Sequence, residues 1–96
     1  MIASFGDRAT EDLFHGRRSA RVWRYPPEMA EAAALKLDSP NAAVALQDLR
    51  TPPGNRLKAL RGDMSGMHSI RVNNQWRLVF RWSEGDAYAV RLTDYH

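Results

Sequence analysis

Four arginines near the end of the chain are spaced in a way that suits phosphate binding. Arg77 and Arg81 occupy alternating positions of one apolar stretch, and Arg71 and Arg91 occupy similar positions in the stretches before and after it. Successive side chains of a β-strand point to opposite faces, so these four are expected to share one face of a sheet. Because guanidinium groups hold phosphate oxygens through paired hydrogen bonds, such a face is suited to binding phosphate.

Three predicted strands carry these arginines. Their apolar side holds Ile70, Val72, Trp76, Leu78, Phe80, Trp82, Tyr88, Val90 and Leu92. This alternation with period two is typical of strands that have one face in a core. Only Asn74 and Gln75 separate the first two strands, and residues 83–86 form a turn before the third, which predicts antiparallel pairing of neighbours.

Two further basic residues, Lys58 and Arg61, precede these strands. Leu57 and Leu60 around them differ in parity, so alternation does not assign this stretch to a single face. Either both faces are partly covered here, or a β-bulge re-aims the chain before Gly62. Lys58 and Arg61 therefore need not share a face.

Helices are predicted in the first half of the chain. Residues 10–16 begin with a capping hydroxyl and end with a glycine, which indicates one or two helical turns. Residues 26–37 open with two prolines and continue with strong helix formers. Ser39 and Pro40 end that helix and start another through Leu49. The apolar residues 1–5 suit an additional edge strand.

Composition limits the type of protein. Ninety-six residues allow one domain, residues 1–96, with a modest core. The chain has no cysteine, which excludes disulfides and thiolate metal sites, and no apolar run long enough for a membrane segment. These features predict a cytoplasmic protein without membrane association. The net charge of +3 is uneven, because residues 25–49 are net acidic and residues 50–96 are net basic.

The sequence lacks the residue patterns of several common types of metal, nucleotide-binding and catalytic site. His15, His68 and His96 have no spacing that makes a metal pair, and neither a glycine-rich phosphate loop nor a Gly-x-Ser-x-Gly turn is present. His15 suits a helix end and His68 shares parity with Ile70, so structural roles are expected for both. No metal and no cofactor are therefore predicted. The remaining candidates for a functional site are the basic face and an ionisable tail from Thr93 to His96.

These residues carry a family resemblance. The run NRLKALRGDMSGMHSIRVNNQWRLVF and the terminal DYH resemble the HigB-type toxins of bacterial type II toxin–antitoxin systems, a branch of the RelE superfamily. Ile2, Ser4, Phe5, Glu11 and the pair Leu13-Phe14 also match. The resemblance implies an α+β, RelE-like fold, with two to three short N-terminal helices packed on one face of a twisted antiparallel sheet of four to five strands.

The resemblance also implies an activity and its partners. It implies ribosome-dependent endoribonuclease cleavage of mRNA in the A site of the 70S ribosome, without a metal. The expected partner is a HigA-type helix-turn-helix antitoxin that neutralises the toxin, and operator DNA is expected to bind only through that antitoxin. In such cleavage the ribose 2′-OH attacks the adjacent phosphorus, so the site needs a base, cations and an acid.

The matching positions imply roles for single residues. Arg77, in the family's Trp-Arg motif, is expected to stabilise charge on the phosphate, and Arg61 is expected to bind phosphate. Apart from the resemblance, the alternation that puts Arg71, Arg81 and Arg91 on the same face as Arg77 predicts further RNA contacts from these three. Lys58 aligns with a position that is a catalytic histidine in some relatives, so charge stabilisation by its ammonium and a part in proton transfer both stay open.

The tail matches the functional end of the family. His96 is expected to act as the acid, because an imidazole titrates near neutral pH. Asp94 is expected to act as the base or to orient the imidazole, and Tyr95 to stack on a base or donate a hydrogen bond to phosphate.

Three other functions remain open from the sequence. A ParE-like toxin uses a similar scaffold to inhibit DNA gyrase without cleaving nucleic acid. A non-catalytic RNA-binding module would use the arginine face only to grip the backbone. An inactive relative is the third, because Lys58 departs from the catalytic pattern.

Overall fold

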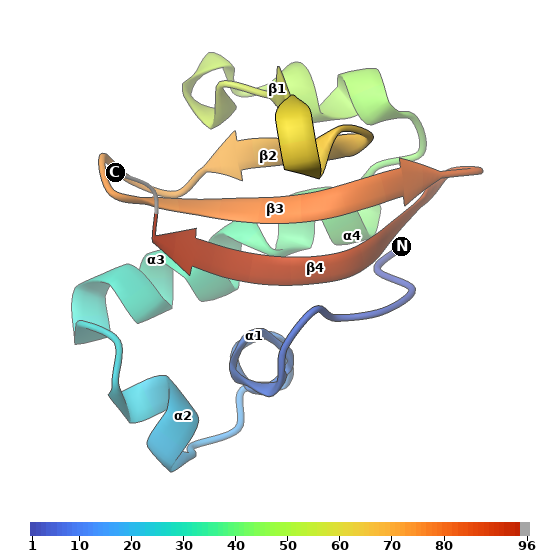
Figure 1. Ribbon diagram of the computed structural model, residues 1–96. Coiled ribbons are helices and arrows are strands. Elements are labelled where there is room, and N and C mark those ends of the chain that lie inside the picture. The colour runs from blue at the N-terminus through green and yellow to red at the C-terminus, as the bar shows by residue number, and fades with distance from the viewer. Residues whose placement is uncertain (95–96) are drawn as a thin grey trace.

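An antiparallel sheet of four strands forms the centre of the computed structural model, which describes residues 1–94 (Figure 1). Its strands are β1 (Lys58–Ala59), β2 (Met67–Arg71), β3 (Trp76–Ser83) and β4 (Asp86–Asp94). They lie in the sheet in chain order, and each is antiparallel to the next. The three predicted strands and their two connecting turns are confirmed.

The N-terminal segment extends the sheet beyond β4. Ile2 and Phe5 form isolated parallel bridges with Ala87 and Val90. The amide of Gly6 donates to the Val90 carbonyl at 2.8 Å. A side chain at Gly6 would place its Cβ 2.8 Å from the Ala89 carbonyl oxygen, so this approach requires glycine. The predicted edge strand is thus present only as two bridges.

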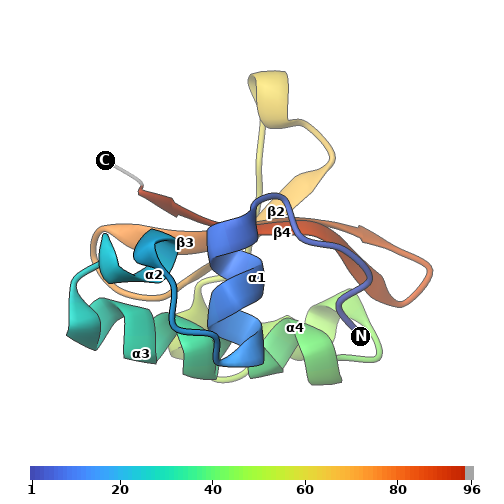
Figure 2. The same ribbon diagram turned by 90° about the horizontal axis from the view of Figure 1, so that it is seen from below.

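Four α-helices precede the sheet, namely α1 (Arg8–His15), α2 (Ala20–Trp23), α3 (Pro27–Lys36) and α4 (Asp38–Ala42). Figures 1 and 2 show α3 and α4 against one face of the sheet, with α1 beside β4. The expected α+β fold with helices on one face is confirmed. No helix in the described part of the chain is long and apolar enough to cross a membrane.

The start of α1 differs from the prediction. Asp7 caps this helix, because its carboxylate accepts a hydrogen bond from the Thr10 amide at 2.8 Å. Thr10 is fully buried inside the helix, and its Oγ1 accepts a hydrogen bond from the Leu92 amide at 2.8 Å. The hydroxyl predicted as a cap instead ties α1 to β4. Gly16 ends the helix with a φ of 69°, as expected for a left-handed cap.

The helix predicted to run to Leu49 is also interrupted. The chain is extended at Ala43, with φ −64° and ψ 136°, and resumes as the 3₁₀ helix η1 (Leu46–Arg50). The Asp48 carboxylate accepts hydrogen bonds from the Val44 and Ala45 amides, at 3.0 and 2.9 Å. These amides are satisfied by a side chain in place of helical carbonyls, which is how aspartate competes with helix formation.

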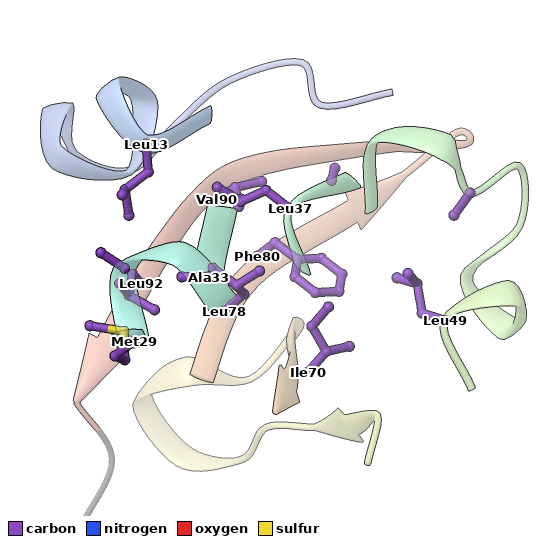
Figure 3. Packing of buried hydrophobic residues seen from close by; sticks show 13 residues of the cluster. Leu13, Met29, Ala33, Leu37, Leu49, Ile70, Leu78, Phe80, Val90 and Leu92 are labelled. Carbon is purple, nitrogen blue, oxygen red and sulfur yellow. The ribbon is translucent and has the colours of Figure 1, made fainter. Parts of the chain in front are cut away.

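The core lies between the sheet and the helices (Figure 3). The helical side contributes Leu13, Met29, Ala33, Leu37 and Leu49, and the strands contribute Ile70, Leu78, Phe80, Val90 and Leu92. In β2 and β3 these are the even-numbered positions that alternation predicted. Burial of each large side chain contributes about 1.5–3 kcal/mol, so this layer dominates the stability of the fold.

A β-bulge changes the alternation in β4. Val79 pairs with Arg91, whereas Arg81 pairs with Tyr88, so β4 holds one extra residue at this point. Ala89 lies there with a φ of 54°. As a result Tyr88 faces away from the core, where the Arg81 guanidinium carbon lies 5.4 Å from the centre of its ring. The prediction that Tyr88 lies on the apolar side was wrong.

Candidate functional site

The face of the sheet opposite α3 and α4 carries the predicted basic residues. Residues directly opposite one another in paired strands share a face. One row across the sheet therefore holds Lys58, Ser69, Val79 and Arg91, and the next holds Arg71, Arg77 and Thr93. Arg81 lies on the same face, two residues beyond Val79 in β3. We call this surface the basic face.

Arg77 is the most strongly fixed residue of the basic face. Its side chain is buried, at 7% exposure, although alternation alone predicts a solvated position. Its Nε donates to the Ser69 hydroxyl at 2.8 Å, and its Nη2 donates to the Arg56 carbonyl at 2.6 Å. These bonds fix the plane of the guanidinium, so its positive charge is held in one place before any ligand binds.

A buried asparagine holds the loop that carries the Arg56 carbonyl. Asn55 is fully buried, and its Oδ1 accepts a hydrogen bond from Lys36 Nζ at 2.6 Å. Its Nδ2 donates to the carbonyls of Leu49 and Thr51, at 3.1 and 3.3 Å. Arg56 follows with a φ of 45°, a left-handed conformation that aims its carbonyl at Arg77.

Lys58 and Arg61 occupy different surroundings. Lys58 is exposed and lies opposite Ser69, whose hydroxyl accepts the hydrogen bond from Arg77 Nε. Arg61 lies beyond the end of β1, just before the 3₁₀ helix η3 (Gly62–Met64). In Figure 2 this loop rises from the side of the sheet that faces away from α3 and α4. The strand has only two residues, so no bulge is needed to explain the parities of residues 57–60.

The other three arginines have contacts of their own. Arg71 Nε donates to the Asn73 carbonyl at 3.2 Å, which ties this side chain to the turn between β2 and β3. Arg81 is exposed above Tyr88, and Arg91 is half-buried. The positive charge on this face is therefore divided between one buried guanidinium and several accessible ones.

The first part of the predicted functional tail lies beside Arg77. Thr93 is directly opposite Arg77, whereas Asp94 is opposite Trp76, so alternation directs Asp94 toward the other face. Asp94 Oδ2 accepts a hydrogen bond from Gln75 Nε2 at 3.1 Å. The predicted site residues Tyr95 and His96 lie outside the described residues.

The remaining histidines have aromatic neighbours. His68 stacks on Phe80 with ring centres 6.3 Å apart, and His15 contacts the rings of Phe5 and Phe14. Within residues 1–94 no three histidine, aspartate or glutamate side chains gather in a way that could hold a metal ion.

Sequence reasoning missed the residues that position Arg77. Ser69 shares parity with Arg71 and was on the basic side of the pattern, but only the register shows that it meets Arg77. No sequence pattern marks Asn55, because its partners are backbone carbonyls of an irregular loop and a lysine from α3.

The sequence is similar to that of known proteins along most of its length. Residues 3–96 match the model of the family described as RelE-like toxin of type II toxin–antitoxin system HigB. The chain is 44% identical to Endoribonuclease HigB of Proteus vulgaris over 96 residues, which is the whole of both chains. It is 40% identical to Toxin HigB-1 of Vibrio cholerae over 87 residues, covering 91% of this chain and 90% of that one.

Solved structures share the fold at low sequence identity. YoeB in the YoeB–YefM complex of Staphylococcus aureus superimposes with a TM-score of 0.61 and 18% identity, over 100% of this chain and 98% of that one. YafQ of Escherichia coli gives a TM-score of 0.55 and 11% identity, over 98% and 93%. The family match along almost the whole sequence and the two HigB relatives show that this chain belongs to the HigB-like family of RelE-like toxins of type II toxin–antitoxin systems.

Proposed function

We propose that this chain is an endoribonuclease toxin that cleaves mRNA in the ribosomal A site through attack of a ribose 2′-OH, without a metal ion. The observation that carries the proposal is the buried Arg77 guanidinium, held by Ser69 and Arg56 on a face that also carries Lys58. The name of the Proteus vulgaris relative, Endoribonuclease HigB, supports the same reaction class.

Arg77 acts as the fixed cation of the proposed reaction. Negative charge grows on the non-bridging phosphate oxygens as the 2′-oxygen attacks, and donors that are already in place stabilise it without further reorganisation. Lys58 adds an ammonium on the same face. The RNA backbone on either side of the scissile bond binds the remaining basic residues, which are Arg61, Arg71, Arg81 and Arg91.

The C-terminal tail supplies proton transfer in this proposal. Strand β4 ends at Asp94, one residue after Thr93, which lies directly opposite Arg77, so the tail starts close to the fixed charge. His96 donates a proton to the leaving 5′-oxygen. Asp94 orients the tail through its bond to Gln75, or exchanges this bond for a position on the face of Arg77 where it accepts the proton of the 2′-OH, and Tyr95 contacts the base or the phosphate.

A cognate antitoxin is the second part of the proposal. Type II systems pair the toxin with a protein, and the Staphylococcus aureus relative of this fold was solved as a complex with YefM. We assign this chain a HigA-type helix-turn-helix antitoxin that neutralises it and through which the pair reaches operator DNA. Its target, the 70S ribosome, places the active toxin in the cytoplasm.

Purified ribosomes test this function directly. The wild-type protein is added to ribosomes that translate a defined mRNA, with and without a chelator that binds transition metals and leaves the Mg²⁺ of the ribosome in place, and the RNA ends are mapped. We expect cuts inside the A-site codon that leave a 2′,3′-cyclic phosphate, both with and without this chelator. Intact mRNA together with inhibition of gyrase supercoiling would instead identify a gyrase inhibitor, and RNA binding without cleavage would identify a binding module.

A further inference from the structure

A groove between α2 and α3 lies apart from the basic face. It is a cavity of about 600 Å³ lined mainly by apolar side chains, those of Val22, Trp23, Tyr25 and Pro27 among them. Trp23 is 73% exposed, which is unusual for a tryptophan outside an interaction site. Tyr25 packs against Trp76, whose side chain points away from the face of Arg77.

The wall formed by α2 is held by polar contacts and by Val22, which is partly buried against the core. None of the four residues of α2 is buried. The buried Asp12 carboxylate of α1 accepts hydrogen bonds from the Ser19 hydroxyl at 2.8 Å and from Arg21 at 3.3 Å. Ser19 also caps α2. These polar contacts therefore hold in place a helix whose Arg21 and Trp23 side chains stay exposed.

Charge differs between the two walls of the groove. On the α2 side Arg18 lines the groove and the exposed Arg24 ends the helix, and on the α3 side Glu31 lines the groove and the exposed Glu28 lies in the first turn. A nucleic acid would be repelled by the two glutamates, whereas the basic face offers it a surface of one sign. An amphipathic helix fits both walls, if its apolar side chains meet Trp23 and its acidic side chains face α2.

We infer that this groove docks the antitoxin through an amphipathic helix that covers Trp23 and pairs acidic side chains with Arg18 and Arg24. The inference rests on the proposed partnership with an antitoxin, and it assigns the contact to the helical side of the molecule. A helix bound here holds the toxin without contacting Arg77. Exposed tryptophans at the centre of apolar grooves commonly carry a large share of the binding energy.

Binding measurements with the antitoxin encoded beside this toxin test the inference. We expect Trp23→Ala to raise the Kd by about 30-fold or more, the effect typical of a dominant interface residue. The double variant Arg18→Glu/Arg24→Glu should also weaken binding. The matched control is Val44→Ala, because Val44 is 81% exposed and lies outside the groove, and its Kd should stay within about twofold of wild type.

Several results would overturn the inference. The first is a Trp23→Ala variant that binds the antitoxin within about threefold of wild type, and the second is an antitoxin that does not bind the wild type. The third is a dimer of the toxin alone that depends on Trp23, which would make the groove a toxin–toxin contact. The fourth is a loss of ribosome binding in Trp23→Ala and not in the other variants, which would make the groove a ribosome contact. Circular dichroism of each variant shows that the fold is kept. Cleavage assays on free toxin separate the two proposals, since a wild type that binds antitoxin but leaves mRNA intact refutes the nuclease function alone.

Discussion

Replacing Asn55 with alanine removes the buried side chain that organises the loop leading to Arg77. Its three hydrogen bonds, at 2.6, 3.1 and 3.3 Å, join Lys36 to the carbonyls of Leu49 and Thr51. A neutral hydrogen bond contributes about 0.5–1.5 kcal/mol net and one to a charged group about 1.5–3. Part of the lysine contribution is regained when water solvates the ammonium. We therefore expect Asn55→Ala to lower the free energy of unfolding by about 2–4 kcal/mol.

Thermal and urea denaturation followed by circular dichroism measure this loss. For a domain of this size the melting temperature should fall by about 10–25 °C. Gln47→Ala is the matched control, because Gln47 is exposed in the adjacent η1 helix, and its effect should stay within about 0.5 kcal/mol. An Asn55→Ala protein as stable as this control would refute the assignment of Asn55 as the organiser of the loop.

Three other substitutions test separate parts of the fold by thermal denaturation. Gly6→Ala should destabilise by about 1–3 kcal/mol, because the new Cβ would lie 2.8 Å from a backbone oxygen of β4 and the chain must shift. Ala89→Gly should stabilise by about 0.5–1 kcal/mol, because glycine relieves the positive φ at the bulge. Asp12→Asn should lower the melting temperature near pH 7. The hydrogen bond from Ser19 holds the pKa of Asp12 below its ordinary value of 3.8, so the stability it supplies is present above that pH. This stability is lost as the pH falls through the lowered pKa, and the two proteins should then converge.

Much of the architecture could be predicted from the sequence, because simple periodicities govern it. Alternation in residues 70–82 assigned both faces of β2 and β3, and the prolines before Glu28 marked the start of α3. The bulge at Ala89 escaped prediction, since one residue in a left-handed conformation reverses the alternation and alanine does not mark such a position. Tyr88 was assigned to the wrong face for that reason.

The candidate site could be predicted only in part. The placement of the arginines on one face follows from local alternation within each strand. The burial of Arg77 does not, because its partner carbonyl belongs to a residue 21 positions earlier, in a loop that Asn55 holds in place. The position of Asp94 opposite Trp76, with Thr93 opposite Arg77, depends on the register between β3 and β4 after the bulge.

The rate of mRNA cleavage by Arg77→Ala under single-turnover conditions on ribosomes tests the central claim most directly. If the fixed guanidinium stabilises charge in the transition state, this rate should fall by about 10²-fold or more, while ribosome binding, measured separately, stays within a few-fold of wild type. Arg8→Ala, in which an exposed arginine of α1 is removed, should cleave at the wild-type rate. Cleavage by a folded Arg77→Ala protein within threefold of wild type would contradict the account.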